Sequence, residues 1–235
     1  MPSGENMRKF DYAVAAAGMF IKHLHTEDFD RGMIATFGNT FRVEQGFTGE
    51  EEQLHLTLAR IHREFYRNFD AHNGGEKTRL YTSIVDMINE FRNSGKRDRP
   101  WILTVVTDGR DEPPSVTEYS GQPEKTGYYI ATHYNHESSN YIFVVGVGED
   151  IDRVALTKLA DVGRFPAMTI EAFPLLEKQF LRIAVEVSSQ VVGVRPAGES
   201  WEEVGRIRRL ALTPIDYAFL IDRSGTMHDF ETTVR

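Results

Sequence analysis

The sequence contains no cysteine among its 235 residues. This absence excludes disulfide scaffolds, thiolate zinc sites and cysteine nucleophiles. Basic residues are also in the minority, with 27 Lys and Arg against 35 Asp and Glu and a net charge of −8. Because nucleic-acid-binding surfaces are usually basic, this balance predicts that no nucleic acid is a partner.

Long apolar runs are missing as well. No stretch approaches the roughly 18 apolar residues of a membrane span, and residues 1–9 lack the apolar core of a signal peptide. We therefore expect a cytoplasmic protein without a membrane span. The composition, 40% hydrophobic and 26% charged, is that of a soluble globular protein, and the length suits a single domain over residues 1–235.

Helical and strand patterns alternate along the chain. Apolar residues at helical spacing predict helices over residues 7–24, 50–69, 80–91, 150–160 (capped by Asp150) and 175–192. Apolar runs predict strands over residues 32–38, 40–47, 101–107, 141–147, 166–173 and 215–222, the first two as a hairpin. Residues 110–128 are expected to form a long loop. The pattern predicts an α/β fold with an open, mostly parallel central sheet and helices on both faces.

Two of the predicted strands end in a carboxylate, at Asp108 and at Asp222. Asp222 is followed two and four residues later by the hydroxyls of Ser224 and Thr226. Ligands of open α/β sheets bind beyond the carboxyl ends of the strands, and hard cations such as Mg²⁺ prefer oxygen ligands. These residues could therefore hold a metal ion, although Asp222 and Ser224 could instead cap a following helix.

Three segments resemble von Willebrand factor type A (vWA) domains. Phe219-Leu-Ile-Asp222-Arg-Ser224-Gly-Thr226-Met227 resembles the Asp-x-Ser-x-Ser motif that begins the family's metal-ion-dependent adhesion site. Gly74-Gly75-Glu-Lys-Thr78-Arg-Leu80-Tyr81 resembles the family's Gly-Gly-Thr-x-Leu-Tyr segment, although two residues separate the glycines from Thr78. Leu103-Thr-Val-Val-Thr-Asp108-Gly109 resembles its strand followed by Thr-Asp-Gly.

This resemblance implies a set of metal ligands. Ser224 and Thr226 would bind Mg²⁺, Mn²⁺ or Ca²⁺ through their hydroxyls, and Thr78 would join them directly or through water. Asp222 and Asp108 would act mainly through bound waters or hydrogen bonds. Family members use the open coordination position to take an acidic residue of a protein partner. The resemblance thus implies a non-enzymatic, divalent-cation-dependent protein-binding module.

The order of the motifs differs from that of the family. The strand with Asp-x-Ser-x-Ser comes first in vWA domains and its helix follows directly, whereas here the strand is C-terminal and the helix N-terminal. We interpret this as a circular permutation in which residues 193–213 bridge the family's usual C- and N-termini, which lie close together. Alternatively, the chain is cut across tandem domains, and its last strand completes a neighbour's sheet by swapping. The oligomeric state is left open.

The sequence also permits other functions. The segment around Asp222 also resembles the first motif of haloacid-dehalogenase-type phosphatases, with Asp222 as nucleophile, but Ser224 stands where the general acid is expected. A metal-independent structural scaffold is a further alternative. Two groups of residues could suggest a zinc site: His23 with His25, and His133 with His136 and Glu137. Their spacing differs from the His-Glu-x-x-His signature of zinc-binding helices. An aromatic interface rim near the metal loop is predicted from Tyr128, Tyr129 and Tyr134.

Overall fold

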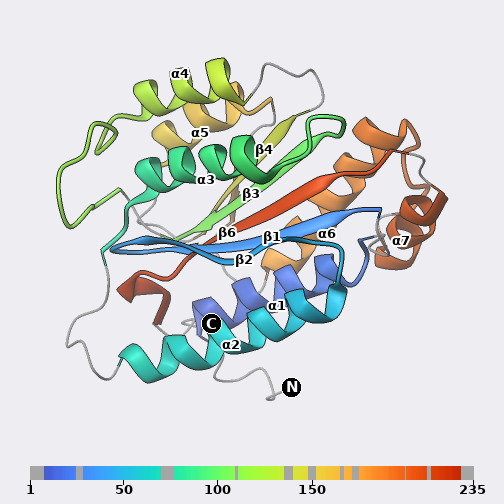
Figure 1. The fold of residues 1–235 in the computed structure, drawn as a ribbon, viewed down its shortest axis with the longest axis horizontal. Helices are drawn as coiled ribbons and strands as arrows, with labels where there is room; N and C mark the ends of the chain where they lie inside the picture. The colour runs from blue at the N-terminus through green and yellow to red at the C-terminus, as the bar shows by residue number, and fades with distance from the viewer. Residues whose placement is uncertain are drawn as a thin grey trace.

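The computed structural model describes residues 8–24, 29–69, 77–108, 111–134, 140–147, 152–164, 167–170, 175–198, 200–210 and 213–228. Its centre is a six-stranded sheet with the strand order β2-β1-β6-β3-β4-β5 (Figure 1). The strands span Arg31–Phe37 (β1), Phe41–Thr48 (β2), Trp101–Thr107 (β3), Tyr141–Val147 (β4), Met168–Ile170 (β5) and Asp216–Asp222 (β6).

The C-terminal strand β6 lies in the middle of this sheet. It pairs in parallel with β1 on one side and with β3 on the other, while β2 is antiparallel to β1. Phe37 is paired with Asp222, and Val106 with Ile221, so β1, β6 and β3 end at the same edge of the sheet. The predicted mostly parallel α/β sheet is thereby confirmed.

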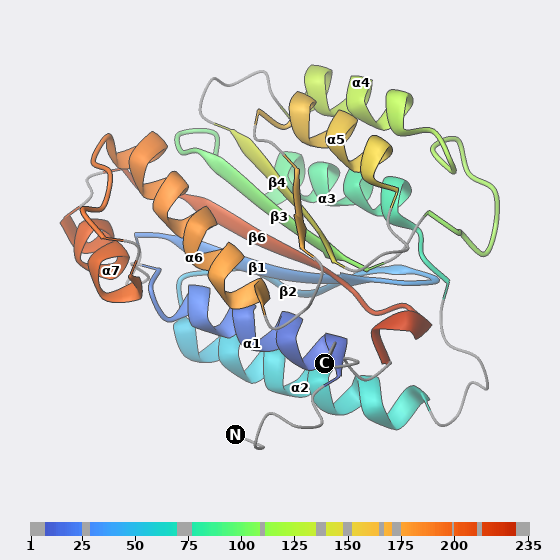
Figure 2. The same cartoon turned by 180° about the vertical axis from the view of Figure 1, so that it is seen from behind.

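Helices cover both faces of the sheet. In Figures 1 and 2, α1, α2 and α6 lie on one face, and α3, α4 and α5 on the other. The helices span Lys9–Ile21 (α1), Glu51–Phe69 (α2), Leu80–Ser94 (α3), Pro123–His133 (α4), Arg153–Val162 (α5), Leu176–Val187 (α6) and Trp201–Leu210 (α7). Two apolar clusters fill the space between the sheet and its two helical layers. The covered strands β3 and β6 are buried along their whole length, as their continuous apolar sequences predict.

Two local predictions were wrong. The predicted loop over residues 110–128 ends in helix α4, which begins at Pro123 and buries little more than Thr126, Gly127 and Ile130. So narrow a buried face leaves no apolar periodicity to detect, although proline at a helix start is a recognised signal. Helix α5 is capped by Asp152, whose side chain accepts a hydrogen bond from the Ala155 amide. The predicted cap, Asp150, lies outside the described residues.

The predicted bridge over residues 193–213 contains α7. Its residues Val204, Ile207 and Arg208 are buried. One face of this helix is therefore packed against the protein. No helix within the described ranges is long and apolar enough to cross a bilayer.

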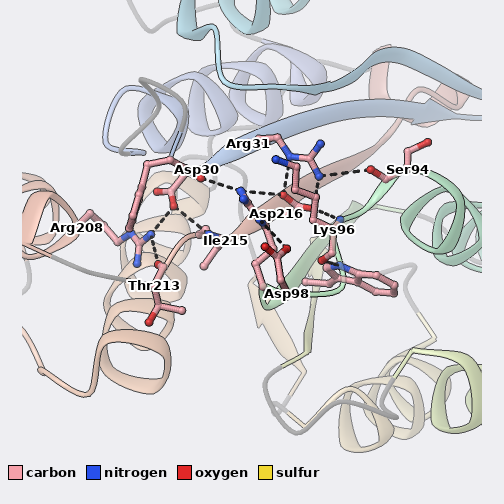
Figure 3. A network of polar contacts seen from close by, with 12 residues as sticks. Asp30, Arg31, Ser94, Lys96, Asp98, Arg208, Thr213, Ile215 and Asp216 are labelled. Atoms are coloured by element: carbon pink, nitrogen blue, oxygen red, sulfur yellow. Dashed lines mark hydrogen bonds and ion pairs between the residues drawn. The ribbon is translucent and has the colours of Figure 1, made fainter.

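A polar network lies at the edge where β1 and β6 begin (Figure 3). Asp30 binds Arg208 of α7 with an O–N distance of 2.6 Å and also accepts a hydrogen bond from the Ile215 amide. Asp216 accepts hydrogen bonds from the Arg31 Nε at 2.9 Å and from the Lys96 amide at 2.7 Å. Both carboxylates are completely buried, so the network attaches α7 and the loop after α3 to the starts of the strands.

Candidate functional site

Asp222 ends β6 and organises the loop that follows it. Its Oδ1 accepts a hydrogen bond of 2.8 Å from the Ser224 amide, and its Oδ2 accepts one of 2.6 Å from the Thr107 hydroxyl at the end of β3. The side chain is completely buried. Because these bonds hold both the turn and the neighbouring strand, Asp222 determines where the hydroxyls that follow it are placed.

A chain of hydrogen bonds runs outward from this loop. The Oγ of Ser224 lies 3.1 Å from the Oγ1 of Thr226, and the Thr226 hydroxyl donates to Asp108 Oδ1 at 2.8 Å. Ser224 and Asp108 are buried, whereas Thr226 is exposed. Four of the five predicted site residues are therefore brought together at the carboxyl edge of the sheet.

The fifth predicted residue, Thr78, is held differently. It is buried just before α3, and its carbonyl oxygen accepts a hydrogen bond of 2.8 Å from the Glu112 amide. Across the described ranges, its side chain forms no hydrogen bond with the other four residues. The motif residues Gly74, Gly75 and Gly109 lie outside the described residues.

Sequence reasoning missed Lys9, the first residue of α1. Its Nζ lies 2.9 Å from Asp108 Oδ2, so the two oxygens of Asp108 are bonded to Thr226 and to Lys9. A signal for this contact was present in the sequence, because a permuted reading places residues 6–10 shortly after the loop that contains Ser224. Thr107, which donates to Asp222, was also not singled out, although it belongs to the quoted Thr-Asp-Gly segment.

The Asp222 carboxyl is held in an unfavourable place for a negative charge. The pKa of Asp222 is raised from 3.8 to about 7, chiefly by burial and in addition by the negative charge of Asp108, while hydrogen bonds from Thr107 and Ser224 oppose the shift. Desolvation and a like charge both disfavour the ionised form. Additional positive charge at this edge would therefore stabilise the ionised pair.

The oxygens present fit a small hard cation. The 3.1 Å between the Ser224 and Thr226 hydroxyl oxygens is close to the edge, about 3.0 Å, of an octahedron of oxygens at about 2.1 Å from Mg²⁺. Thr226 donates its proton to Asp108, so Ser224 is the donor to Thr226, and one lone pair of the Thr226 oxygen is left for an ion. No group of three or more His, Asp or Glu side chains suited to a metal occurs in the described part of the chain. A metal ion at this edge would depend on the hydroxyls.

The raised pKa of Asp222 predicts a pH-dependent stability. Because the folded chain binds the Asp222 proton more tightly than the unfolded chain does, the metal-free protein should lose stability as pH rises through about 7. We expect the free energy of unfolding to fall by about 1 kcal/mol between about pH 6 and pH 8 through this group. Urea unfolding in the presence of a chelator would measure it, with Asp222→Asn as the reference. Equal pH dependence in both proteins would contradict the prediction.

The predicted aromatic rim is not formed. Tyr134 is completely buried, and its hydroxyl donates to the carbonyl oxygens of Trp101 and Tyr141, at the starts of β3 and β4. It therefore points to the edge opposite Asp222. Tyr129 stacks on His133, and of the three tyrosines only Tyr128 is exposed.

The two histidine groups give no metal site within the described residues. The ring of His23 stacks on Trp201, and the Nδ1 of His133 contacts the carbonyl oxygen of Tyr129. The other predicted members of these groups, His25, His136 and Glu137, lie outside the described residues.

Comparison with known proteins identifies the fold. No family model matches the sequence, and no curated protein matches it. A von Willebrand factor type A protein from Catenulispora acidiphila aligns over 77% of this chain and 38% of its own, at 16% identity and a TM-score of 0.56. Proximal thread matrix protein 1 from the mussel byssus aligns over 74% of this chain and 40% of its own, at 13% identity and a TM-score of 0.52.

The aligned region is about two fifths of the length of these two proteins. At such low identity the likeness concerns the fold and not the chemistry of the site. The mostly parallel six-stranded sheet with helices on both faces is thus the fold of vWA-type domains.

Proposed function

We propose that this chain is a protein-binding module that depends on a divalent cation held at the carboxyl edge of its sheet. The hydroxyls of Ser224 and Thr226 would bind the ion, with Asp222 and Asp108 behind them and Thr78 approaching from the start of α3. The observation that carries the proposal is the hydrogen-bonded series Ser224–Thr226–Asp108 beside the buried Asp222.

Each residue has a defined task in this arrangement. Asp222 accepts a hydrogen bond from the Ser224 amide and so fixes the direction of the Ser224 hydroxyl. Asp108 accepts a hydrogen bond from the Thr226 hydroxyl, so a lone pair of the Thr226 oxygen could face the ion. When bound, Mg²⁺ or Mn²⁺ would supply an electrophilic position for the Asp or Glu carboxylate of a partner protein.

We also propose that the vWA order is circularly permuted in this chain. The central position of β6 between β1 and β3 supports this proposal, as does the contact of Lys9 at the start of α1 with Asp108. Helix α7 lies within residues 193–213, the segment that would join the family's usual termini. β6 pairs within its own chain, so the sheet does not require strand swapping to be complete.

The surroundings of Asp222 favour binding over phosphatase chemistry. A nucleophilic carboxylate needs an oxygen that can reach the phosphorus atom of a substrate. Both Asp222 oxygens already accept hydrogen bonds, from Ser224 and Thr107, and the side chain is completely buried. A rigidly held, inaccessible carboxylate suits a positioning role better than a nucleophilic one.

Adding Mg²⁺ or Mn²⁺ is expected to stabilise the wild-type chain. Because the ion would bind the folded state only, the gain would be about 2.7 kcal/mol at a concentration 100 times the Kd. Asp222→Asn and Ser224→Ala should abolish this gain, whereas Asp161→Asn, on the exposed side of α5, should keep it. Thermal unfolding with and without metal measures the gain, and titration calorimetry measures the binding.

The controls separate the alternatives. Each variant is compared with itself in the presence and absence of metal, so a change in its basal stability does not affect the result. Absence of both binding heat and stabilisation in the wild type would refute the metal site and favour the metal-independent scaffold. Hydrolysis of p-nitrophenyl phosphate with Mg²⁺ that is lost in Asp222→Asn would support the phosphatase instead. Partner capture should require Mg²⁺ and fail with chelator or with Ser224→Ala.

A further inference from the structure

A positive charge of the chain itself lies against the site. The Lys9 ammonium is 2.9 Å from Asp108 Oδ2, and the Asp108 side chain is completely buried. We propose that Lys9 is a built-in cation that occupies the acidic site in the metal-free state, and that a divalent metal binds by displacing it. This inference rests on the proposed metal site and concerns its regulation.

The charge balance supports competition between the two cations. Asp108 and Asp222 are both completely buried, and the Lys9 ammonium provides one positive charge beside them. The two Asp108 oxygens are already bonded to Lys9 and Thr226, so an ion that approaches the Thr226 hydroxyl also approaches the ammonium. Like charges in such a weakly solvated place repel strongly. The ion and the ammonium therefore exclude each other around Asp108.

Lys9 is also placed so that it can leave. It is the first residue of α1, and its side chain is 23% exposed, so part of the side chain already borders solvent. A lysine side chain has a flexible four-carbon stem and a strongly hydrated head, so release into solvent requires no backbone movement. Metal binding would then break a contact between α1 and the end of β3. The site would fill only at metal concentrations high enough to displace the lysine.

The test compares Lys9→Gln with Lys22→Gln. Both variants remove one positive charge from the same region of the chain, but Lys22 is the exposed residue at the far end of α1. Calorimetric titration with Mn²⁺ should give an affinity about tenfold higher for Lys9→Gln than for the wild type. Lys22→Gln should stay within about twofold of the wild type, because exposed charges at a distance are screened.

A second measurement uses the wild-type chain, so it requires no substitution that could impair folding. In a protein labelled with ¹⁵N-lysine, the Lys9 ammonium signal should move toward the position of solvated lysines when Mg²⁺ is added. The Lys22 signal should stay constant. A Lys9 signal that is unchanged at saturating Mg²⁺ would overturn the inference.

The outcomes distinguish this inference from the proposed function. Equal Mn²⁺ affinity in the wild type and in Lys9→Gln would overturn the role of Lys9 and leave the metal site standing. Binding to Lys9→Gln alone would support the competition while overturning metal dependence in the natural chain. Binding to neither protein would overturn both.

Discussion

Asp30→Ala is expected to lower the free energy of unfolding by about 3–5 kcal/mol. Asp30 and Arg208 are buried, and they form an ion pair of 2.6 Å between the start of β1 and helix α7. Among the residues that the structure describes, the Nε and Nη1 of Arg208 find no hydrogen-bond partner, so the guanidinium depends heavily on this carboxylate. Removing Asp30 would leave a buried positive charge without compensation and would also free the Ile215 amide.

Urea unfolding of Asp30→Ala, Arg208→Ala and the double variant would measure this effect. The double variant should lose less stability than the sum of the two single variants, because it leaves no charge unpaired. Arg206→Ala is the matched control in the same helix, since Arg206 is paired with Glu203 at the surface. That change should cost at most about 1 kcal/mol. A similar cost for Asp30→Ala and Arg206→Ala would show that the pair does not hold α7 in place.

Phe219→Ala is expected to cost about 3–5 kcal/mol as well. Phe219 is completely buried in the middle of β6. Its ring lies parallel to that of Phe180, with 5.8 Å between centroids, and is 5.6 Å from the ring of Phe20. These neighbours come from α6 and α1, which pack on the same face of the sheet. The truncation would leave a cavity between β6 and these two helices that the helices cannot move to fill.

The same unfolding measurement tests this prediction. Phe219→Leu should cost less than Phe219→Ala, because more of the cavity stays filled. Leu210→Ala is the surface control, since Leu210 at the end of α7 is 67% exposed, and it should change stability by less than about 0.5 kcal/mol. An unchanged m-value would show that the loss reflects the native core and not a more compact unfolded state. A cost for Phe219→Ala as small as that of Leu210→Ala would contradict the packing described above.

Much of the sheet was predictable because its strands are covered on both faces. The apolar runs of β3 and β4 were predicted with the bounds that the structure has, Trp101–Thr107 and Tyr141–Val147. Burial on both sides demands continuous apolar sequence, which is easy to recognise. The candidate site was predictable for a related reason, since carboxylates that follow parallel strands must gather at one edge. Asp108 and Asp222 lie together at this edge. Asp222 accepts a hydrogen bond from Thr107, and Asp108 accepts one from Thr226.

Other features could not be derived from local patterns. Helix α4 buries too few apolar side chains to show a period, and the pattern of α7 did not reveal that Arg208 is buried beside Asp30. The contact between Lys9 and Asp108 joins residues 99 positions apart. Apolar periodicity reports which side of an element avoids water, and it contains no information on which distant charge will face it.

Composition and apolar patterning alone thus decide the strands of the sheet, most of the helices that cover it and the edge of the sheet where the polar residues collect, because burial acts on each segment separately. The pairing of charges was decided by packing in three dimensions. Only when β6 lies between β1 and β3 does α1 bring Lys9 to Asp108, and only then does α7 bring Arg208 to Asp30. Ion pairs between distant segments depend on the final arrangement of the whole chain. At the carboxyl edge of the sheet, the pair of Lys9 with Asp108 determines how much positive charge the candidate site already holds.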